Sequence, residues 1–166
     1  MASSPVLSYS ISQRAVHWLT VLLVLFNFIS GGVFDSLKEI RAAGGTPTPD
    51  MFLPAQLHAF SGIAILVLLV TRLCLRYFQG APGVPADEPP FFQLVAKLVH
   101  GGLYLMLILM PVSGMAKMYG GVDLAGFIHA GPFKLAILVL IAVHVAGALV
   151  HQFYWKTDVL KRMTRG

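Results

Sequence analysis

Four long runs without a charged residue dominate the pattern of hydrophobic and polar positions along the chain. They cover residues 15–34, 55–71, 98–116 and 135–155, which are 20, 17, 19 and 21 residues long. A helix needs about 20 apolar residues to cross the hydrocarbon core of a bilayer. The pattern therefore predicts an all-α membrane protein, a four-transmembrane-helix bundle with helices at about 12–34, 54–78, 92–118 and 131–155. With such short connections, residues 1–166 are expected to form a single transmembrane domain.

Glycine and proline mark the connections between the apolar runs. Residues 35–54, 79–90 and 117–131 hold clusters of one or both residue types, which is typical of turns and loops. We expect outer loops over 35–54 and 117–131 and a cytoplasmic linker over 79–90. Pro111 lies inside the third run and predicts a kink that neighbouring helices can tolerate.

Composition and charge agree with a membrane protein. The chain is 57% hydrophobic and 11% charged, whereas soluble domains are about 25% charged. If both termini lie on one side of the membrane, that side carries eight of the twelve Lys and Arg residues. This asymmetry places both termini in the cytoplasm by the positive-inside rule. The net charge of +5 is then explained by topology and membrane lipids, and we expect no nucleic acid as a partner.

Histidines carry the chemistry of the apolar runs. All six lie within or just ahead of a run, at His17, His58, His100, His129, His144 and His151. An ionisable side chain in hydrocarbon is costly and therefore points to a function. Imidazole is also a common axial ligand of haem iron. The single cysteine, Cys74, and the absence of a Cys-x-x-Cys-His motif exclude a thioether-linked haem, so any haem is held non-covalently.

The predicted topology separates the histidines by depth. The first and third helices start in the cytoplasm, so their histidines lie near the inner face, whereas His58 and His129 lie near the outer face. His144 follows His129 by fifteen residues, about 22 Å along a helix, and His151 lies lower still. The outer half of the membrane thus contains one pair of histidines, and the inner half contains four histidines. Two six-coordinate haems would use four histidines and leave two inner ones free.

Several motifs occur in a recognisable order along the chain. They are Arg14-Ala15-Val16-His17-Trp18, His58 followed by Arg72 and Arg76, His100-Gly101-Gly102-Leu103-Tyr104, Met110-Pro111-Val112-Ser113-Gly114, and the segments 144–151 and 155–163. Over nearly the whole chain this set resembles the bacterial cytochrome b561 family. The resemblance implies a four-helix bundle in the bacterial inner membrane with two non-covalent b-type haems. It also implies electron exchange with a quinone, ubiquinone in the family's superoxide oxidases.

The resemblance also implies roles for individual histidines. The inner haem would be held by His17 and His144 and the outer haem by His58 and His129, while His100 and His151 would either contact quinone and protons or serve as polar packing residues. The family usually places fourteen residues between its two fourth-helix ligands and an acidic residue after the first. Here the offset is fifteen and Ala130 follows, so His129 departs from the pattern.

Three classes of function remain open on the sequence. The first is a redox enzyme of the superoxide:ubiquinone type, and the second is an electron carrier or membrane anchor for a partner dehydrogenase or periplasmic redox protein. The third is a transporter whose histidines move protons or metal ions. Superoxide would need a positive outer patch to attract it, for which the candidates are Lys38, Arg41, Lys117 and Lys134. Four acidic residues balance them on that side, so charge alone does not select a class.

Overall fold

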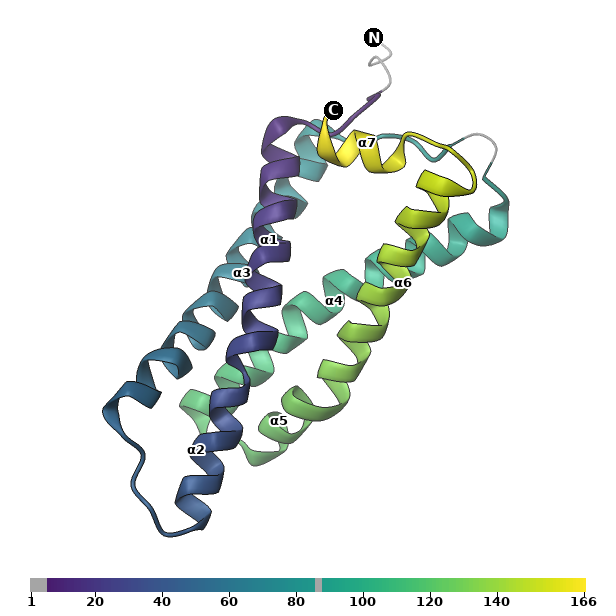
Figure 1. Ribbon diagram of the computed structural model, residues 1–166. Helices are drawn as coiled ribbons and strands as arrows, with labels where there is room; N and C mark the ends of the chain where they lie inside the picture. Colours follow the sequence, from purple (N-terminus) through teal and green to yellow (C-terminus); the bar gives the residue numbers. More distant parts are fainter. Residues whose placement is uncertain (1–5, 86–87) are drawn as a thin grey trace.

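The computed structural model describes residues 6–85 and 88–166, and every regular element in these ranges is helical (Figure 1). The elements are α1 Ile11–Ser30, α2 Gly32–Ala42, η1 Pro49–Met51, α3 Phe52–Gln79, α4 Pro90–Gly120, α5 Asp123–Ile128, η2 His129–Phe133, α6 Lys134–Phe153 and α7 Val159–Thr164. Four stretches are long and apolar enough to cross a membrane: Ile11–Ala42, Pro49–Gln79, Pro90–Gly120 and Asp123–Phe153. The predicted all-α architecture with four apolar spans is confirmed.

Both connections predicted as outer loops contain much more helix than expected. After a break at Gly31, α2 carries the helix through residues 35–42, and α5 with η2 occupies 123–133. The apolar runs end at the first charged residue, but a helix does not have to end there. The segment 35–42 is rich in good helix formers and contains no proline. α4 continues to Gly120 and stops at Gly121, which has the left-handed φ of 66° that favours glycine.

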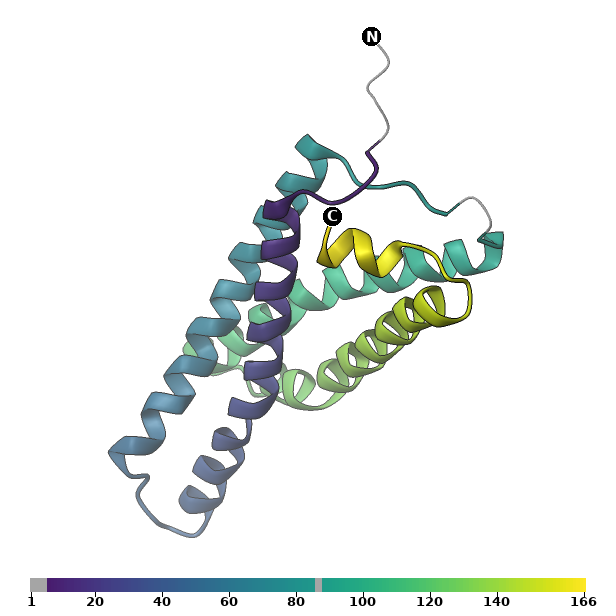
Figure 2. The same ribbon diagram turned by 45° about the horizontal axis from the view of Figure 1, so that its top comes forward.

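The long helices pack as successive neighbours. α1 lies against α3, α3 against α4, and α4 against α6, an arrangement visible in both ribbon views (Figures 1 and 2). Polar side chains join the first pair, because the Asn27 amide donates to the Ser61 hydroxyl at 2.7 Å. The buried Gln13 amide donates to the Gly80 carbonyl at 2.8 Å, where α3 ends. Such interhelical hydrogen bonds fix helices to one another in an apolar surrounding.

The start of α1 and the C-terminus lie at the same end of the bundle, called here the terminal end (Figure 1). α2 and α5 lie toward the other end, called the opposite end. At the terminal end α7 crosses from α6 toward α1, and its far end is bonded to α1 (Figures 1 and 2). The Trp18 indole donates to the Met163 carbonyl at 3.0 Å, and Arg14 donates to the Thr164 carbonyl at 3.3 Å. α7 therefore ties the last apolar helix to the first.

Candidate functional site

One histidine pair lies toward the opposite end of the bundle. His58 from α3 and His129 from η2 face each other with ring centroids 6.2 Å apart. His58 Nδ1 lies 3.0 Å from the Ser30 hydroxyl, and His129 Nδ1 lies 2.8 Å from the Met110 carbonyl. A carbonyl only accepts, so His129 carries its hydrogen on Nδ1 and keeps a lone pair on Nε2. Metal-binding imidazoles are held in this way by their second nitrogen.

His129 does not lie in a loop, because the structure places it in a π-helical turn that leads directly into α6. η2 spans His129–Phe133 and contains Pro132. A π turn closes on the residue five positions away and holds one residue more than an α turn. In a regular α-helix, offsets of fourteen and fifteen residues differ by about 100° in direction. The π turn absorbs the additional residue, which accounts for His129 facing His58 despite its spacing from His144.

A second pair lies toward the terminal end. His17 from α1 and His144 from α6 have ring centroids 6.3 Å apart. His100 from α4 joins them, with its ring centroid 5.1 Å from that of His144. The His100 Nδ1 donates to the Ala96 carbonyl of its own helix at 2.7 Å. Three imidazoles from three different helices therefore meet at this level.

The ring separations can be compared with what one iron requires. An imidazole nitrogen binds a transition metal at about 2.0 Å and lies about 1.1 Å from its ring centre, so two rings on opposite sides of one iron have centres about 6.2 Å apart. The pairs His58–His129 and His17–His144, at 6.2 and 6.3 Å, match this distance. The ring centroids of His100 and His144 are 5.1 Å apart, which is too short for two ligands on opposite sides of one iron. The geometry therefore fits two bis-imidazole iron sites.

The surroundings fit a haem better than a bare metal ion. A porphyrin supplies four nitrogens, so the protein needs to provide two ligands, whereas a bare ion needs three or more. In residues 6–85 and 88–166, no group of three His, Cys, Asp or Glu side chains is arranged to hold an ion. At Gly114 a Cβ would come within 3.1 Å of His129 Cε1, so glycine leaves room for that ring. At Gly147, one turn from His144, a Cβ would meet no atom within 4 Å, so the space beside the helix is open there.

His151 is engaged through both ring nitrogens. Nδ1 lies 2.9 Å from the Thr157 hydroxyl, and Nε2 lies 3.6 Å from a carboxylate oxygen of Glu88. Both His151 and Glu88 are buried, at 9% and 8% exposure, and the Gln93 amide donates to the Glu88 carbonyl at 2.7 Å. This arrangement leaves no nitrogen of His151 free for iron. It instead forms a buried, titratable pair at the terminal end.

Glu88 was not predicted from the sequence because it lies in a linker that reads as solvent-exposed. The one indication in the sequence is the Pro89-Pro90 pair that follows Glu88. Two prolines restrict the backbone just before α4 begins, so the position of Glu88 is restricted as well. Arg72 was expected only as a motif residue, yet it lies close enough to His17, His100 and His144 to interact with each electrostatically. A carboxylate-bearing ligand at this level would find a cation there.

Comparison with known proteins identifies the family. Residues 8–166 match the family described as prokaryotic cytochrome b561. The chain is 34% identical to cytochrome b562 of Cereibacter sphaeroides, over 95% of both chains. It is 28% identical to a probable superoxide oxidase of Yersinia pestis, over 93% of this chain and 94% of the relative. With cytochrome b561 homolog 1 of Escherichia coli the identity is 26%, over 93% and 96% of the two chains.

This chain belongs to the prokaryotic cytochrome b561 family. The resemblance inferred from the ordered motifs is thereby confirmed, and so is the expectation of a multi-pass bacterial membrane protein with b-type haem. In a b561-type cytochrome, paired membrane histidines have a ready explanation as axial ligands.

The four cations of the opposite end differ in their surroundings. Lys117 forms an ion pair with Asp123, and its side chain packs where a Cβ at Gly126 would otherwise lie. Lys38, Arg41 and Lys134 are exposed, and within the described ranges no carboxylate lies within ion-pair distance of them. The four cations therefore do not form one cluster of contacting side chains, and the charge of Lys117 is partly neutralised by Asp123.

Proposed function

We propose that this b561-type cytochrome binds two non-covalent haems, one at each histidine pair, and transfers electrons across the inner membrane to quinone. The observation that carries this proposal is the presence of two matched ring pairs at two depths. A Cβ on Gly31, at the end of α1, would lie 3.6 Å from the His58 ring, and His17 precedes Gly31 by fourteen residues. Along a helix this is about 21 Å, a large part of the hydrocarbon thickness.

The four ligands in this proposal are His58 and His129 for the outer haem and His17 and His144 for the inner one. When bound, haem supplies reversible one-electron chemistry at its iron. With two imidazoles held for each iron, these residues would favour electron transfer over binding of oxygen. Ser30 and the Met110 carbonyl orient the outer pair through Nδ1, and such partners raise ligand basicity and set ring orientation.

We place the terminal end in the cytoplasm and treat residues 1–166 as one transmembrane domain. The start of α1 and the C-terminus lie at that end (Figure 1), together with eight of the twelve Lys and Arg residues, as the positive-inside rule requires. The pair His58–His129 then faces the periplasmic half. The pair His17–His144 faces the cytoplasmic half.

Quinone reduction consumes protons, and the terminal end supplies groups that can carry them. The buried Glu88–His151 pair joins the connection before α4 to the last turn of α6, next to the cytoplasm in our orientation. A histidine that is hydrogen-bonded through one nitrogen and lies near a carboxylate with the other can accept a proton on one nitrogen and release it from the other. We assign His151 and Glu88 to proton delivery, and His100 to the quinone contact beside His144.

For the electron donor we propose superoxide and for the acceptor ubiquinone. Support comes from the relative named as a probable superoxide oxidase and from the exposed Lys38, Arg41 and Lys134 at the periplasmic end. Cations at an entry point raise the encounter rate with an anion. The alternative is a carrier or anchor for a partner dehydrogenase or periplasmic redox protein, which makes contact through its outer surface and needs no such attraction.

A direct test follows superoxide-driven reduction of the purified protein in stopped flow, with and without a water-soluble ubiquinone. We expect rapid reduction of the Soret and α bands, followed by turnover only when quinone is present. A control with superoxide dismutase should abolish the signal. A protein that shows haem bands but does not react with superoxide would support the carrier or anchor function, and a protein without any Soret band would support a transporter.

A further inference from the structure

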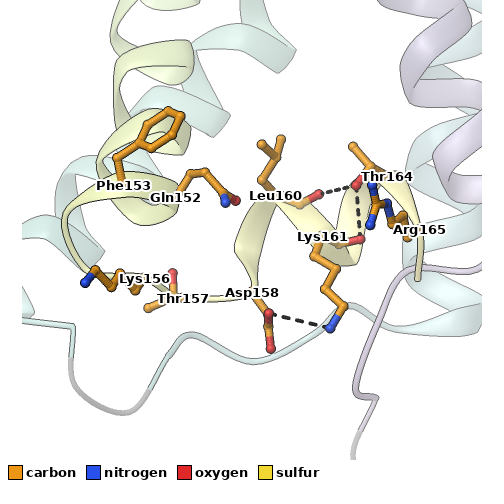
Figure 3. A pocket seen from close by; sticks show the side chains of 9 residues that line it. All are labelled: Gln152, Phe153, Lys156, Thr157, Asp158, Leu160, Lys161, Thr164 and Arg165. Carbon is orange, nitrogen blue, oxygen red and sulfur yellow. Dashed lines mark hydrogen bonds and ion pairs between the residues drawn. The ribbon is translucent and has the colours of Figure 1, made fainter.

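A basic cavity lies at the terminal end, in the corner between α6 and α7, away from both histidine pairs. Its volume is about 730 Å³, and its walls are formed by Gln152, Phe153, Lys156, Thr157, Asp158, Leu160, Lys161, Thr164 and Arg165. Figure 3 shows these side chains on the last turn of α6, the connecting turn and α7. None of them has a part in the electron-transfer proposal except Thr157, which contacts His151 through its hydroxyl.

The charge of the cavity is positive. Lys156, Lys161 and Arg165 supply three cations, and Asp158 supplies one carboxylate. Asp158 lies 3.8 Å from Lys161 (Figure 3). In the part of the chain that the structure describes, Lys156 and Arg165 have no carboxylate within ion-pair distance. Two cations are therefore available to an anionic ligand.

The turn that presents Lys156 is held in an unusual conformation. Lys156 has a φ of 53°, and it is the one non-glycine residue with positive φ in the described ranges. The turn is fixed on both sides of it, because the Thr157 amide donates to the His151 carbonyl at 2.9 Å and the Trp155 amide donates to the Val150 carbonyl at 3.0 Å. Backbone strain of this kind persists where the surroundings impose it, and such positions often bind ligands.

The cavity lies at the level where the last span leaves the apolar layer. The span ends at Phe153, and Phe153 and Tyr154 are 73% and 79% exposed, as aromatic residues at a membrane interface are. Phe153 and Leu160 give the cavity an apolar side, and exposed Leu149 lies one turn further into the span. A ligand here meets cations at headgroup level and an apolar track directed along α6.

From this combination we infer that the α6–α7 corner binds the headgroup of an anionic phospholipid. The headgroup lies among the cations of the cavity, with Lys156 on the α6 side and Arg165 at the far end of α7 (Figure 3), and an acyl chain lies along Phe153. Basic pockets at the ends of membrane helices are suited to anionic headgroups, and Arg pairs especially well with phosphate oxygens. A free phosphate would satisfy the cations but would leave the apolar side of the cavity unused.

Native mass spectrometry of the purified holoprotein tests this with phosphatidylglycerol, with phosphatidylcholine of the same acyl chains, and with inorganic phosphate. We expect phosphatidylglycerol to bind at least about tenfold more tightly than phosphatidylcholine, and phosphate to compete only weakly. K156Q/R165Q should lower phosphatidylglycerol affinity about 20-fold, since each cation near the headgroup contributes substantially. The bound haem, read from the Soret band, should be unchanged.

The matched control is K97Q against K156Q. Each removes one exposed lysine from the terminal end, but Lys97 lies on α4 outside the cavity. K156Q should weaken phosphatidylglycerol binding severalfold and K97Q less than twofold. Equal effects of the two variants would mean that overall charge, and not this cavity, attracts the lipid and would overturn the proposal. Equal affinity for the two lipids, or tight binding of phosphate alone, would overturn it as well.

Discussion

The two histidine pairs share one ring separation but differ in what surrounds them. At the opposite end His58 and His129 form an isolated pair, and each is held through Nδ1 by a neighbouring hydroxyl or carbonyl. At the terminal end the pair His17–His144 is joined by His100, while the buried pair His151–Glu88 lies where α6 ends. The first site contains a histidine pair and its supports, whereas the second half also holds a third imidazole and a buried Glu–His pair.

This difference matches the tasks that we propose for the two ends, which are electron entry at the opposite end and quinone reduction at the terminal end. An oriented pair of ligands is sufficient where only electrons enter. Reduction of a quinone also takes up protons, which requires groups that titrate near neutrality, and histidine is the side chain suited to this task. In our proposal, the additional histidines at the terminal end serve the end where electron and proton transfer meet.

The largest expected effect is loss of a haem from the terminal pair. His144→Ala removes a proposed ligand and leaves His17 unpaired, so haem content should fall from two to one per chain, with a lower yield of folded protein. His151→Ala should retain both haems, because both nitrogens of His151 already have partners. A pyridine haemochrome assay against protein mass measures both variants. Loss of a haem in His151→Ala but not in His144→Ala would reverse the assignment of the inner ligand.

The next effect separates proton delivery from haem binding. Glu88→Gln and His151→Ala should each slow quinone reduction by about 100-fold, the lower end for loss of a general acid or base, with both haems retained. If the two groups act as one relay, the double variant should be little slower than either single one. Steady-state rates with a soluble ubiquinone provide the measurement. Additive losses would show that the residues act separately.

A smaller effect concerns attraction of superoxide to the opposite end. The triple variant K38Q/R41Q/K134Q should slow the reaction with superoxide about fivefold and flatten its dependence on ionic strength. Lys117→Gln should change the rate less than any one of these substitutions, because Lys117 already pairs with Asp123. Stopped-flow rates at two salt concentrations, with haem content as control, decide the point. An unchanged rate and salt slope in the triple variant would favour a protein donor.

A deletion for which we expect no loss of haem tests how the π turn accommodates the spacing of His129. Deletion of Ala130 shortens the offset between His129 and His144 to fourteen residues, which a regular α-helix places near the same direction. We expect the π turn to become an α turn and both haems to remain. Insertion of one alanine at the same point should rotate His129 by about 100° and release the outer haem. Loss of haem from the deletion variant would show that η2 has another role.

The sequence predicted the four spans because the absence of charge over 17 to 21 residues has one physical explanation in a chain of this composition. It could not predict α2 or α5, since hydrophobicity falls where a membrane ends although helix propensity does not. The grouping of the histidines followed from depth and the choice of His144 over His100 from the family resemblance, and the ring separations favour the same choice. The Glu88–His151 and Lys117–Asp123 contacts depend on how connecting segments fold back, which no local pattern specifies.

The central claim is that two bis-histidine sites exist, one in each half of the bundle. The most direct measurement is the haem-to-protein ratio of the purified wild-type chain, obtained by pyridine haemochrome spectroscopy and quantitative amino-acid analysis. The matched separations of 6.2 and 6.3 Å predict a ratio of two. A reproducible ratio of one in fully folded protein would contradict the account and would remove one of the two pairs from the function proposed for it.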